Sequence, residues 1–147
     1  MKQHNRVGIV GYGAVGQGVA KLFPGAAIHD PPLGYEDSAG INASRFAFVC
    51  LPTPSNPDGS CDISLVEAAV AWIEAEIIVV RSTVPPGTTA LLAERYGKRI
   101  VFQPEYGPGE TPDHPYSDVR TIPWVILGGR REWTLPVCDL YKRVYNA

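Results

Sequence analysis

The stretch Arg6-Val7-Gly8-Ile9-Val10-Gly11-Tyr12-Gly13-Ala14-Val15-Gly16 joins an apolar run to glycines spaced as G-x-G-x-x-G. An apolar helical pattern follows, so the stretch predicts a strand, a tight turn and a helix. In that context Gly11 permits the turn, Gly13 lets the backbone approach a pyrophosphate, and Gly16 lets the helix pack closely on the strand. The first helical turn, which begins near Ala14 and Val15, offers unpaired N–H groups to the phosphates.

An acidic residue after the next apolar run sharpens this interpretation. A second strand is predicted at residues 26–29, and Asp30 comes 19 residues after Gly11. A carboxylate at this place accepts hydrogen bonds from both hydroxyls of an adenosine ribose. It also repels a 2′-phosphate, so the sequence favours NAD over NADP. The alternative of a structural turn with a solvated Asp30 stays open here, because a glycine triplet alone is weak evidence.

Length and composition limit the classes of protein that fit. The chain has 147 residues, 45% of them hydrophobic, which predicts one globular domain over residues 1–147. A net charge of −2 without a Lys/Arg cluster argues against nucleic acid and an anionic membrane as partners. No apolar run is long enough for a signal peptide or a membrane span, so we expect a cytoplasmic protein. Three cysteines without C-x-x-C spacing predict free thiols and no metal site.

Strands and helices are predicted to alternate along the rest of the chain. Further strands are expected at residues 46–51, 77–80, 99–102 and 124–127, and helices at residues 13–23, 64–75, 88–96 and from about residue 135. The pattern predicts a Rossmann-type, doubly wound, mostly parallel six-stranded α/β sheet with helices on both faces. Residues 31–40 have turn composition with at most one helical turn, and residues 103–123 are expected to form a loop over the site.

Two of these helices carry more detailed predictions. Ser64 and Glu67 have the spacing of a capping box, and Trp72 falls on the buried stripe of the same helix. That spacing favours a core position for Trp72 over a surface on which a ligand stacks. The closing helix has an apolar face that must dock on the sheet or pair with a second copy.

Loops rich in Gly, Thr and Pro follow the predicted strands and converge on the edge where such sheets bind ligands. Three sequence blocks in these loops, together with the glycine motif, resemble in order the amino-terminal domain of the UDP-glucose/GDP-mannose dehydrogenases. The resemblance covers nearly the whole chain. The blocks are Leu51-Pro52-Thr53-Pro54 with Asp58-Gly59-Ser60 and Asp62-Ile63-Ser64, Ser82-Thr83-Val84-Pro85-Pro86-Gly87-Thr88, and Pro104-Glu105-Tyr106.

The resemblance implies a cofactor and roles for particular residues. It implies that NAD lies along Pro52, Thr53, Ser82 and Thr83, with Thr83 near the nicotinamide. It also implies that Glu105 organises water and substrate near the reacting carbon, which makes Thr83 and Glu105 the candidate catalytic residues. From the residues alone, two simpler roles stay open: the threonines cap the following helices, and Glu105 is a solvated loop acid.

The sequence departs from the family where the chemistry is carried. Family members oxidise a primary alcohol of a nucleotide sugar through a cysteine in a G-G-x-C-x-P-K-D segment, assisted by a lysine from a central helical domain. This sequence contains neither segment, and its own cysteines (Cys50, Cys61 and Cys138) are not expected to substitute. The family's L-R-E-G is replaced here by Gly107-Pro108-Gly109-Glu110. Activity of this chain alone is therefore not expected.

Three hypotheses follow for function. The first is the NAD-binding part of a split or truncated nucleotide-sugar oxidoreductase, completed by a separate catalytic subunit. The second is a non-catalytic module that binds NAD(H) or another adenine nucleotide, and the third is an interaction protein. A homodimer through the closing helix is the further partner that the sequence predicts.

Overall fold

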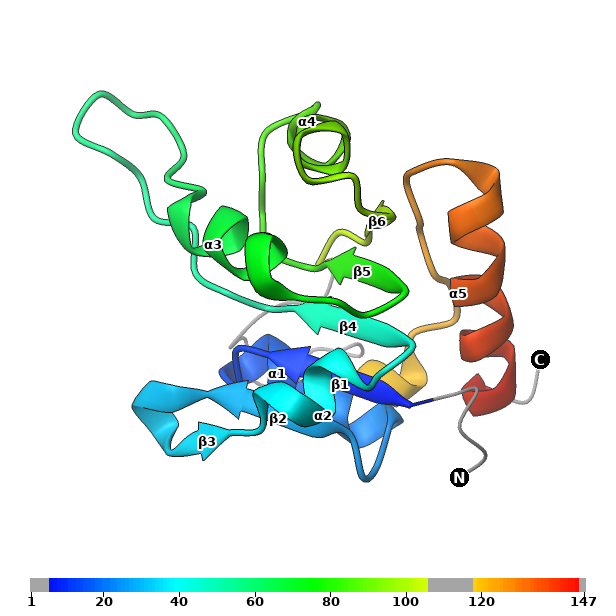
Figure 1. Ribbon diagram of the computed structural model, residues 1–147. Coiled ribbons are helices and arrows are strands. Elements are labelled where there is room, and N and C mark those ends of the chain that lie inside the picture. Colours follow the sequence, from blue (N-terminus) through cyan, green and yellow to red (C-terminus); the bar gives the residue numbers. More distant parts are fainter. Residues whose placement is uncertain (1–5, 106–117, 146–147) are drawn as a thin grey trace.

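The computed structural model describes residues 6–105 and 118–145. Its centre is a six-stranded sheet in the order β3-β2-β1-β4-β5-β6 (Figure 1). Neighbouring strands are parallel except β2 and β3, which are antiparallel. The strands are β1 (Val7–Val10), β2 (Ala27–Asp30), β3 (Tyr35–Glu36), β4 (Phe46–Val49), β5 (Ile77–Val80) and β6 (Ile100–Phe102). The predicted Rossmann-type, mostly parallel sheet is confirmed.

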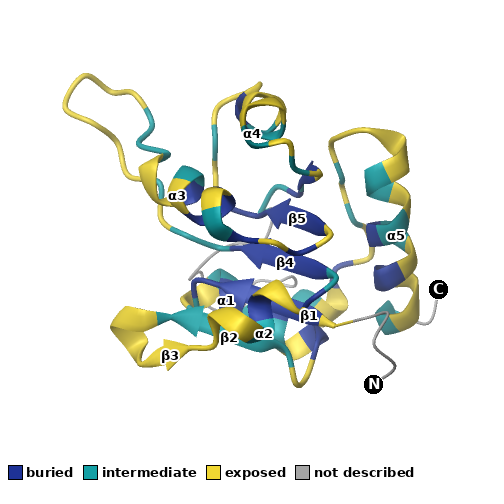
Figure 2. Ribbon diagram, viewed as in Figure 1, coloured by how far each residue is buried: buried dark blue, intermediate teal, exposed yellow. Residues whose placement is uncertain are grey.

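Helices cover both faces of this sheet. Successive residues of a strand point to opposite faces, so a continuous apolar run supplies two cores. Phe46 and Phe48 of β4 pack in one core with α1 and α5, whereas Ala47 and Val49 pack in the other with α2, α3 and α4. The central strands are accordingly buried, while β3 and the segment that projects between β4 and α3 are exposed (Figure 2). The helices are α1 (Ala14–Leu22), α2 (Ser38–Asn42), α3 (Ser64–Trp72), α4 (Thr88–Tyr96) and α5 (Arg131–Tyr145), with 3-10 turns η2 (Pro31–Leu33) and η3 (Val119–Thr121).

The sixth strand is not the one that the sequence predicts. Residues 124–127 form no strand, and their segment meets the sheet only through an isolated antiparallel bridge between Gly128 and Phe102. β3 supplies the sixth strand from a region expected to be a turn. The apolar run has another use: Val125 and Leu127 pack on the core that contains α1 and α5, while Trp124 and Ile126 are 43% and 53% exposed.

The capping box predicted at the start of α3 is wrong. Ile63 is the N-cap, and the Oδ1 atom of Asp62 accepts the Ser64 N–H at 2.9 Å. Glu67 instead pairs with Arg95 and accepts a hydrogen bond from the Tyr96 hydroxyl at 3.0 Å. The side chain that was expected to close its own helix therefore joins α3 to α4.

The closing helix α5 docks its apolar face on the sheet, which is one of the two alternatives that the sequence left open. Val137, Leu140 and Tyr141 are buried in the core with β4 and β5. The helix begins at Arg131, before the predicted start, and continues through Pro136. A proline inside a helix removes one backbone hydrogen bond. Trp133, one turn before Pro136, packs against the core.

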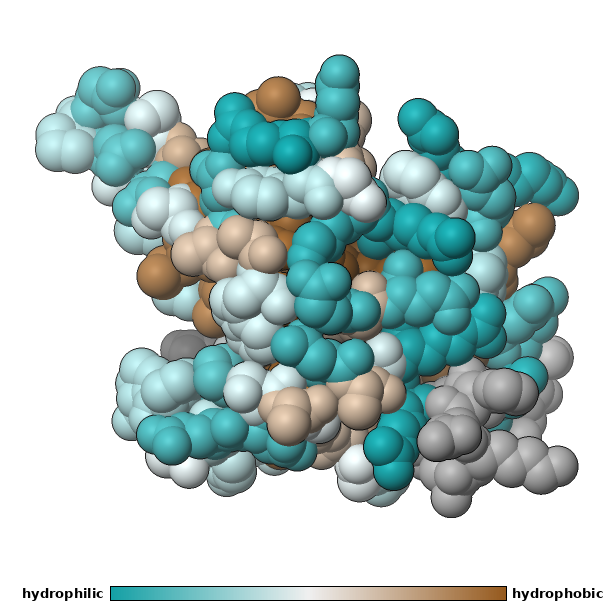
Figure 3. Space-filling model, viewed as in Figure 1, coloured by the Kyte–Doolittle hydropathy of each residue, from teal (hydrophilic) through white to brown (hydrophobic). Residues whose placement is uncertain are grey.

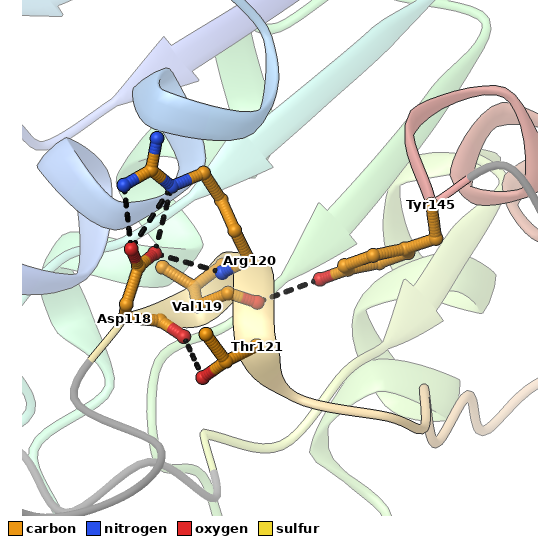
Figure 4. Close-up of polar contacts among 5 residues, drawn as sticks. All are labelled: Asp118, Val119, Arg120, Thr121 and Tyr145. Carbon is orange, nitrogen blue, oxygen red and sulfur yellow. Dashed lines mark hydrogen bonds and ion pairs between the residues drawn. The ribbon is translucent and has the colours of Figure 1, made fainter.

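The last turn of α5 is also tied to η3. The Tyr145 hydroxyl donates to the Val119 carbonyl at 2.9 Å, and the Asp118 carboxylate accepts the Arg120 N–H at 3.0 Å and pairs with the Arg120 guanidinium (Figure 4). The Thr121 hydroxyl donates to the Asp118 carbonyl at 2.7 Å. Because η3 packs against α1, these bonds hold α1 and α5 together on one face.

The surface in Figure 3 is mainly hydrophilic, with hydrophobic residues in separate patches. Ion pairs join connections that are distant in the sequence, such as Arg45 with Glu76 and Lys98 with Glu74. In residues 6–105 and 118–145, no helix is both long and apolar enough to cross a membrane. α5, with 15 residues, falls short of the roughly 20 that a span needs.

Candidate functional site

A cavity of about 810 Å³ lies at the carboxyl ends of the parallel strands. Its wall combines the turn between β1 and α1, the end of β2, the loops after β4, β5 and β6, and one side of α3. Of the predicted site residues, Gly16 alone does not line it. The others all do: Gly11, Gly13, Ala14, Val15, Asp30, Pro52, Thr53, Ser82, Thr83 and Glu105.

The glycines of the motif do three different things. Gly11 has a φ of +90°, and a Cβ there would lie 2.4 Å from the Cys50 carbonyl oxygen. A Cβ on Gly16 would lie 2.0 Å from the Gly11 carbonyl oxygen, so this glycine lets α1 pack on the turn. A Cβ on Gly13 would meet nothing within 4 Å. Gly13 is the N-cap of α1, and no side chain among the described residues caps this helix. Ala14 and Val15, which carry its first N–H groups, line the cavity.

Asp30 is the last residue of β2 and lies beside this turn. Its Oδ2 atom accepts the Tyr12 N–H at 2.6 Å, and its Oδ1 atom accepts no hydrogen bond from the described residues. The carboxylate is thus fixed at the cavity wall with one oxygen unused by the part of the chain that the structure describes. An unused carboxylate oxygen next to a helix N-terminus suits a group that carries both hydroxyls and phosphates.

The threonines are joined across the cavity wall. The Thr53 hydroxyl donates to the Thr83 carbonyl at 2.6 Å. Neither residue caps a helix, because α3 begins at Ser64 and α4 begins at Thr88 with Gly87 as its N-cap. The helix-cap alternative is therefore wrong. Ser82 has a structural task as well: its Oγ atom accepts the Leu51 N–H at 2.9 Å and so joins the loops after β4 and β5.

Trp72 and His29 also line the cavity, and neither was predicted there. Trp72 packs partly on the core, as expected, but its ring also faces the cavity and lies 5.0 Å from the His29 ring. A helical stripe cannot show this, because an indole is long enough to reach past the helix that carries it. His29 directly precedes Asp30, and this position next to a predicted cofactor-binding residue was the signal in the sequence that could have found it.

Arg81 and Glu105 lie side by side in the cavity wall. Arg81 directly follows β5, and its guanidinium forms an ion pair with the Glu105 carboxylate. Their side chains are 9% and 27% exposed, so Glu105 is not the solvated loop acid of the simpler alternative. Tyr106 and Gly107-Pro108-Gly109-Glu110 lie outside the described residues, as does most of the loop predicted to cover the site.

Sequence comparison decides the family. A model described as the NAD binding domain of the UDP-glucose/GDP-mannose dehydrogenase family matches residues 34–147. The chain belongs to this family. The match begins after the glycine motif and Asp30, so it is narrower than the resemblance over nearly the whole chain that the motifs indicate. Domains of this family bind NAD, and the open Gly13, the helix N-terminus and Asp30 fit that cofactor.

Two curated relatives are UDP-N-acetyl-D-mannosamine dehydrogenases from two strains of Methanococcus maripaludis. They are 39% and 38% identical over 92 residues, which is 56% of this chain and 21% of each relative. This chain thus matches about a fifth of the length of these relatives.

Solved structures extend the likeness of fold to almost the entire chain. A UDP-glucose dehydrogenase from Pyrobaculum islandicum has a TM-score of 0.72 at 22% identity, over 95% of this chain and 44% of that one. A ternary complex of GDP-mannose dehydrogenase from Pseudomonas aeruginosa has a TM-score of 0.68 at 22% identity, over 96% and 44%. The fold therefore includes the glycine turn and β2, which the family model does not match.

Cysteine chemistry in this NAD-binding domain is limited. Cys50 lines the cavity, but burial raises the pKa of its thiol to about 12, against a smaller lowering by the positive charge of Arg81. Cys61 does not line the cavity, and its Sγ atom lies 3.7 Å from the Thr83 carbonyl oxygen. Cys138 lies on α5. The described residues contain no group of three or more His, Cys, Asp or Glu side chains placed to hold a metal ion.

We expect Cys50 to resist thiol reagents in the folded state. At pH 8 a pKa of about 12 leaves about one thiolate in ten thousand, against about one in ten at the ordinary 9.0. The thiolate fraction falls about a thousandfold, and the greater nucleophilicity of a more basic thiolate recovers part of this loss. In a Cys61→Ser/Cys138→Ser variant, labelling with Ellman's reagent should therefore be slower by about two orders of magnitude than in 8 M urea. A folded-state rate within about threefold of the urea rate would contradict the raised pKa.

Proposed function

We propose that this chain holds NAD(H) in the cavity as the cofactor-binding part of an oxidoreductase that acts on a CH–OH group of a nucleotide sugar. One observation carries the proposal. The open Gly13 backbone, the Asp30 carboxylate and the Thr83–Glu105 wall, which come from distant parts of the sequence, line a single cavity. The relatives with named substrates are much longer than this chain, so the reaction on a nucleotide sugar is itself part of the proposal.

In this proposal the adenosine side is held near β1 and β2. The N–H groups of Ala14 and Val15, in the first turn of α1, bind the pyrophosphate with help from the partial positive charge of the helix N-terminus. Asp30 accepts the ribose hydroxyls, and its negative charge disfavours a 2′-phosphate. Gly11 and Gly16 shape this turn, and the open space at Gly13 leaves room for the phosphates.

The nicotinamide side is then held by the loops after β4, β5 and β6. Pro52 and Ser82 form the wall, and Thr53 and Thr83 offer polar groups along the cofactor. The bound cofactor supplies the hydride acceptor. Glu105 is the base in this proposal, since its carboxylate lines the same end and accepts a proton from water or a substrate hydroxyl.

The thiol and the lysine of the family's chemistry are proposed to come from a separate catalytic part or subunit. Among the described residues lining the cavity there is no lysine, and the thiol there, Cys50, stays protonated at pH 7 because of its raised pKa. The same observation favours a second candidate function, a module that binds NAD(H) without catalysing the reduction of NAD.

Pairing of two copies through α5 stays a prediction that light scattering tests.

The binding proposal predicts that Asp30→Ala weakens NAD binding at least tenfold. The substitution removes the acceptor for the ribose hydroxyls, and charge-assisted hydrogen bonds of this kind contribute about 1.5–3 kcal/mol. Isothermal titration calorimetry with NAD measures the change. The preference for NAD over NADP should shrink in the same variant, because the negative charge that repels the 2′-phosphate is gone.

Asp37→Ala is the matched control for this experiment. Asp37 also accepts a backbone N–H, that of Gly40 at 2.8 Å, but it does not line the cavity. Its loss should change the stability of α2 and leave the NAD affinity within about twofold. If the unaltered chain does not bind NAD at millimolar concentration, or if both variants lose affinity equally, the proposed site is wrong.

A further inference from the structure

A partly buried ion pair lies at the end of the cavity away from Asp30. Asp30 ends β2, whereas Arg81 and Glu105 follow β5 and β6, and β1 and β4 separate the two sites in the sheet. If the adenosine ribose lies at Asp30, a dinucleotide that crosses the glycine turn brings its nicotinamide to the Arg81–Glu105 end. The inference below rests on the proposed function in this respect.

The structure holds both members of the pair in place. The Arg81 N–H donates to the Val49 carbonyl at 2.8 Å, and the Gln103 N–H donates to the Val80 carbonyl at 2.9 Å, which fixes the backbone before Glu105. Gln103 is buried, and its Oε1 atom accepts the Tyr141 hydroxyl at 2.8 Å. These hydrogen bonds hold the backbone at Arg81 and just before Glu105 in place, so the guanidinium can orient the carboxylate.

The carboxylate is the more exposed member of the pair. The Arg81 side chain is 9% exposed and the Glu105 side chain 27%, and both line the cavity. The carboxylate is therefore the more accessible of the two charges. Cys50 adds no charge at pH 7 because its pKa is about 12. The remaining described wall residues at this end, such as Pro52 and Thr83, are uncharged.

We propose that Arg81 is a positioning residue which holds the Glu105 carboxylate toward the nicotinamide, so that the site prefers oxidised to reduced cofactor. The nicotinamide ring carries a positive charge in NAD⁺ and none in NADH, whereas the rest of the two molecules is the same. A fixed carboxylate near the ring stabilises the charged form, and the interaction is stronger in a partly buried cavity than in water. Arg81, the less exposed member of the pair, opposes this attraction less strongly than Glu105 provides it.

The test measures the affinities for NAD⁺, NADH and ADP-ribose in the intact chain and in Arg81→Met/Glu105→Gln. Both charges are removed together because removal of one leaves the other buried and unpaired. We expect the ratio of the NADH Kd to the NAD⁺ Kd to fall about five- to tenfold. The ADP-ribose Kd should change less than about twofold, since this ligand lacks the ring. Arg81→Lys should keep the preference in part, because it retains the charge without the planar fork.

Arg99→Met/Glu76→Gln is the matched control. Arg99 and Glu76 form an exposed pair at 3.4 Å, and Glu76 also pairs with Arg45. They lie at the amino ends of β6 and β5, and neither lines the cavity, which is at the carboxyl ends. Their removal makes the same change in charge and should leave the ratio unaltered. An intact chain that binds NAD⁺ and NADH equally overturns the inference whatever the variants do, as does an equal change in the control. An intact chain that binds none of the three ligands contradicts the proposed function instead.

Discussion

Gly13→Val is expected to abolish measurable NAD binding and to leave the fold intact. The position is open to solvent, since a Cβ there meets no atom within 4 Å. That open space adjoins the first N–H groups of α1, and in the proposed complex the pyrophosphate fills it. The branched side chain of valine would occupy the volume of the phosphates and prevent their hydrogen bonds.

Calorimetry with NAD up to millimolar concentration measures this effect, and urea unfolding measures the fold. The cost to stability should stay below about 1 kcal/mol, the usual loss when a favourable N-cap residue is replaced by an apolar one. The backbone at Gly13 has a φ of −73°, which valine adopts without left-handed strain. Binding of NAD by Gly13→Val with a Kd close to that of the unaltered chain would show that the phosphates lie elsewhere.

Gly16→Ala is expected to have the opposite consequence, a large loss of stability. Alanine normally stabilises a helix interior by about 1 kcal/mol relative to glycine. Here its Cβ would lie 2.0 Å from the Gly11 carbonyl oxygen, and a backbone atom cannot rotate away. Either α1 or the turn must move, so we expect a net destabilisation of about 3 kcal/mol or more, at the upper end of overpacking costs.

The free energy of unfolding in urea measures this loss, and Gly13→Ala provides the control. It makes the same chemical change three residues earlier in the same motif, where the added methyl group meets nothing. Gly13→Ala should lose less than about 1 kcal/mol. Equal stabilities of the two variants would mean that the close contact between α1 and the Gly11 turn does not constrain the fold.

Much of the fold could be predicted because the sheet is parallel and buried. Such strands are continuous apolar runs, and β4 and β5 lie within the predicted segments. The run at residues 124–127 looked the same in sequence, yet it packs on the core as an irregular segment. An apolar run records that a segment is buried. It does not record whether its N–H and C=O groups find a neighbouring strand.

Polar side chains were less predictable for a related reason. Ser64 and Glu67 had the spacing of a capping box, but Glu67 found Arg95 and Tyr96 on another helix. The N-cap bond and the interhelical bonds compete for one carboxylate, and the competitor is remote in sequence. Trp72 was assigned to the core by its helical position, whereas the neighbourhood of its ring depends on His29 from β2.

The sequence by itself determined the positions of the glycine turn, Asp30 and the threonine loops, because parallel strands bring their carboxyl ends to one edge. Only the tertiary structure decided what each residue does there. It separated Gly13, which faces open space, from Gly16, which is pressed against a carbonyl oxygen. It also brought Arg81 and Glu105, 24 positions apart, into one ion pair. The physical reason is that the spacing of residues along the chain determines the local strand, turn or helix and the end of it at which a residue lies. Contacts and burial depend instead on which distant segment packs alongside.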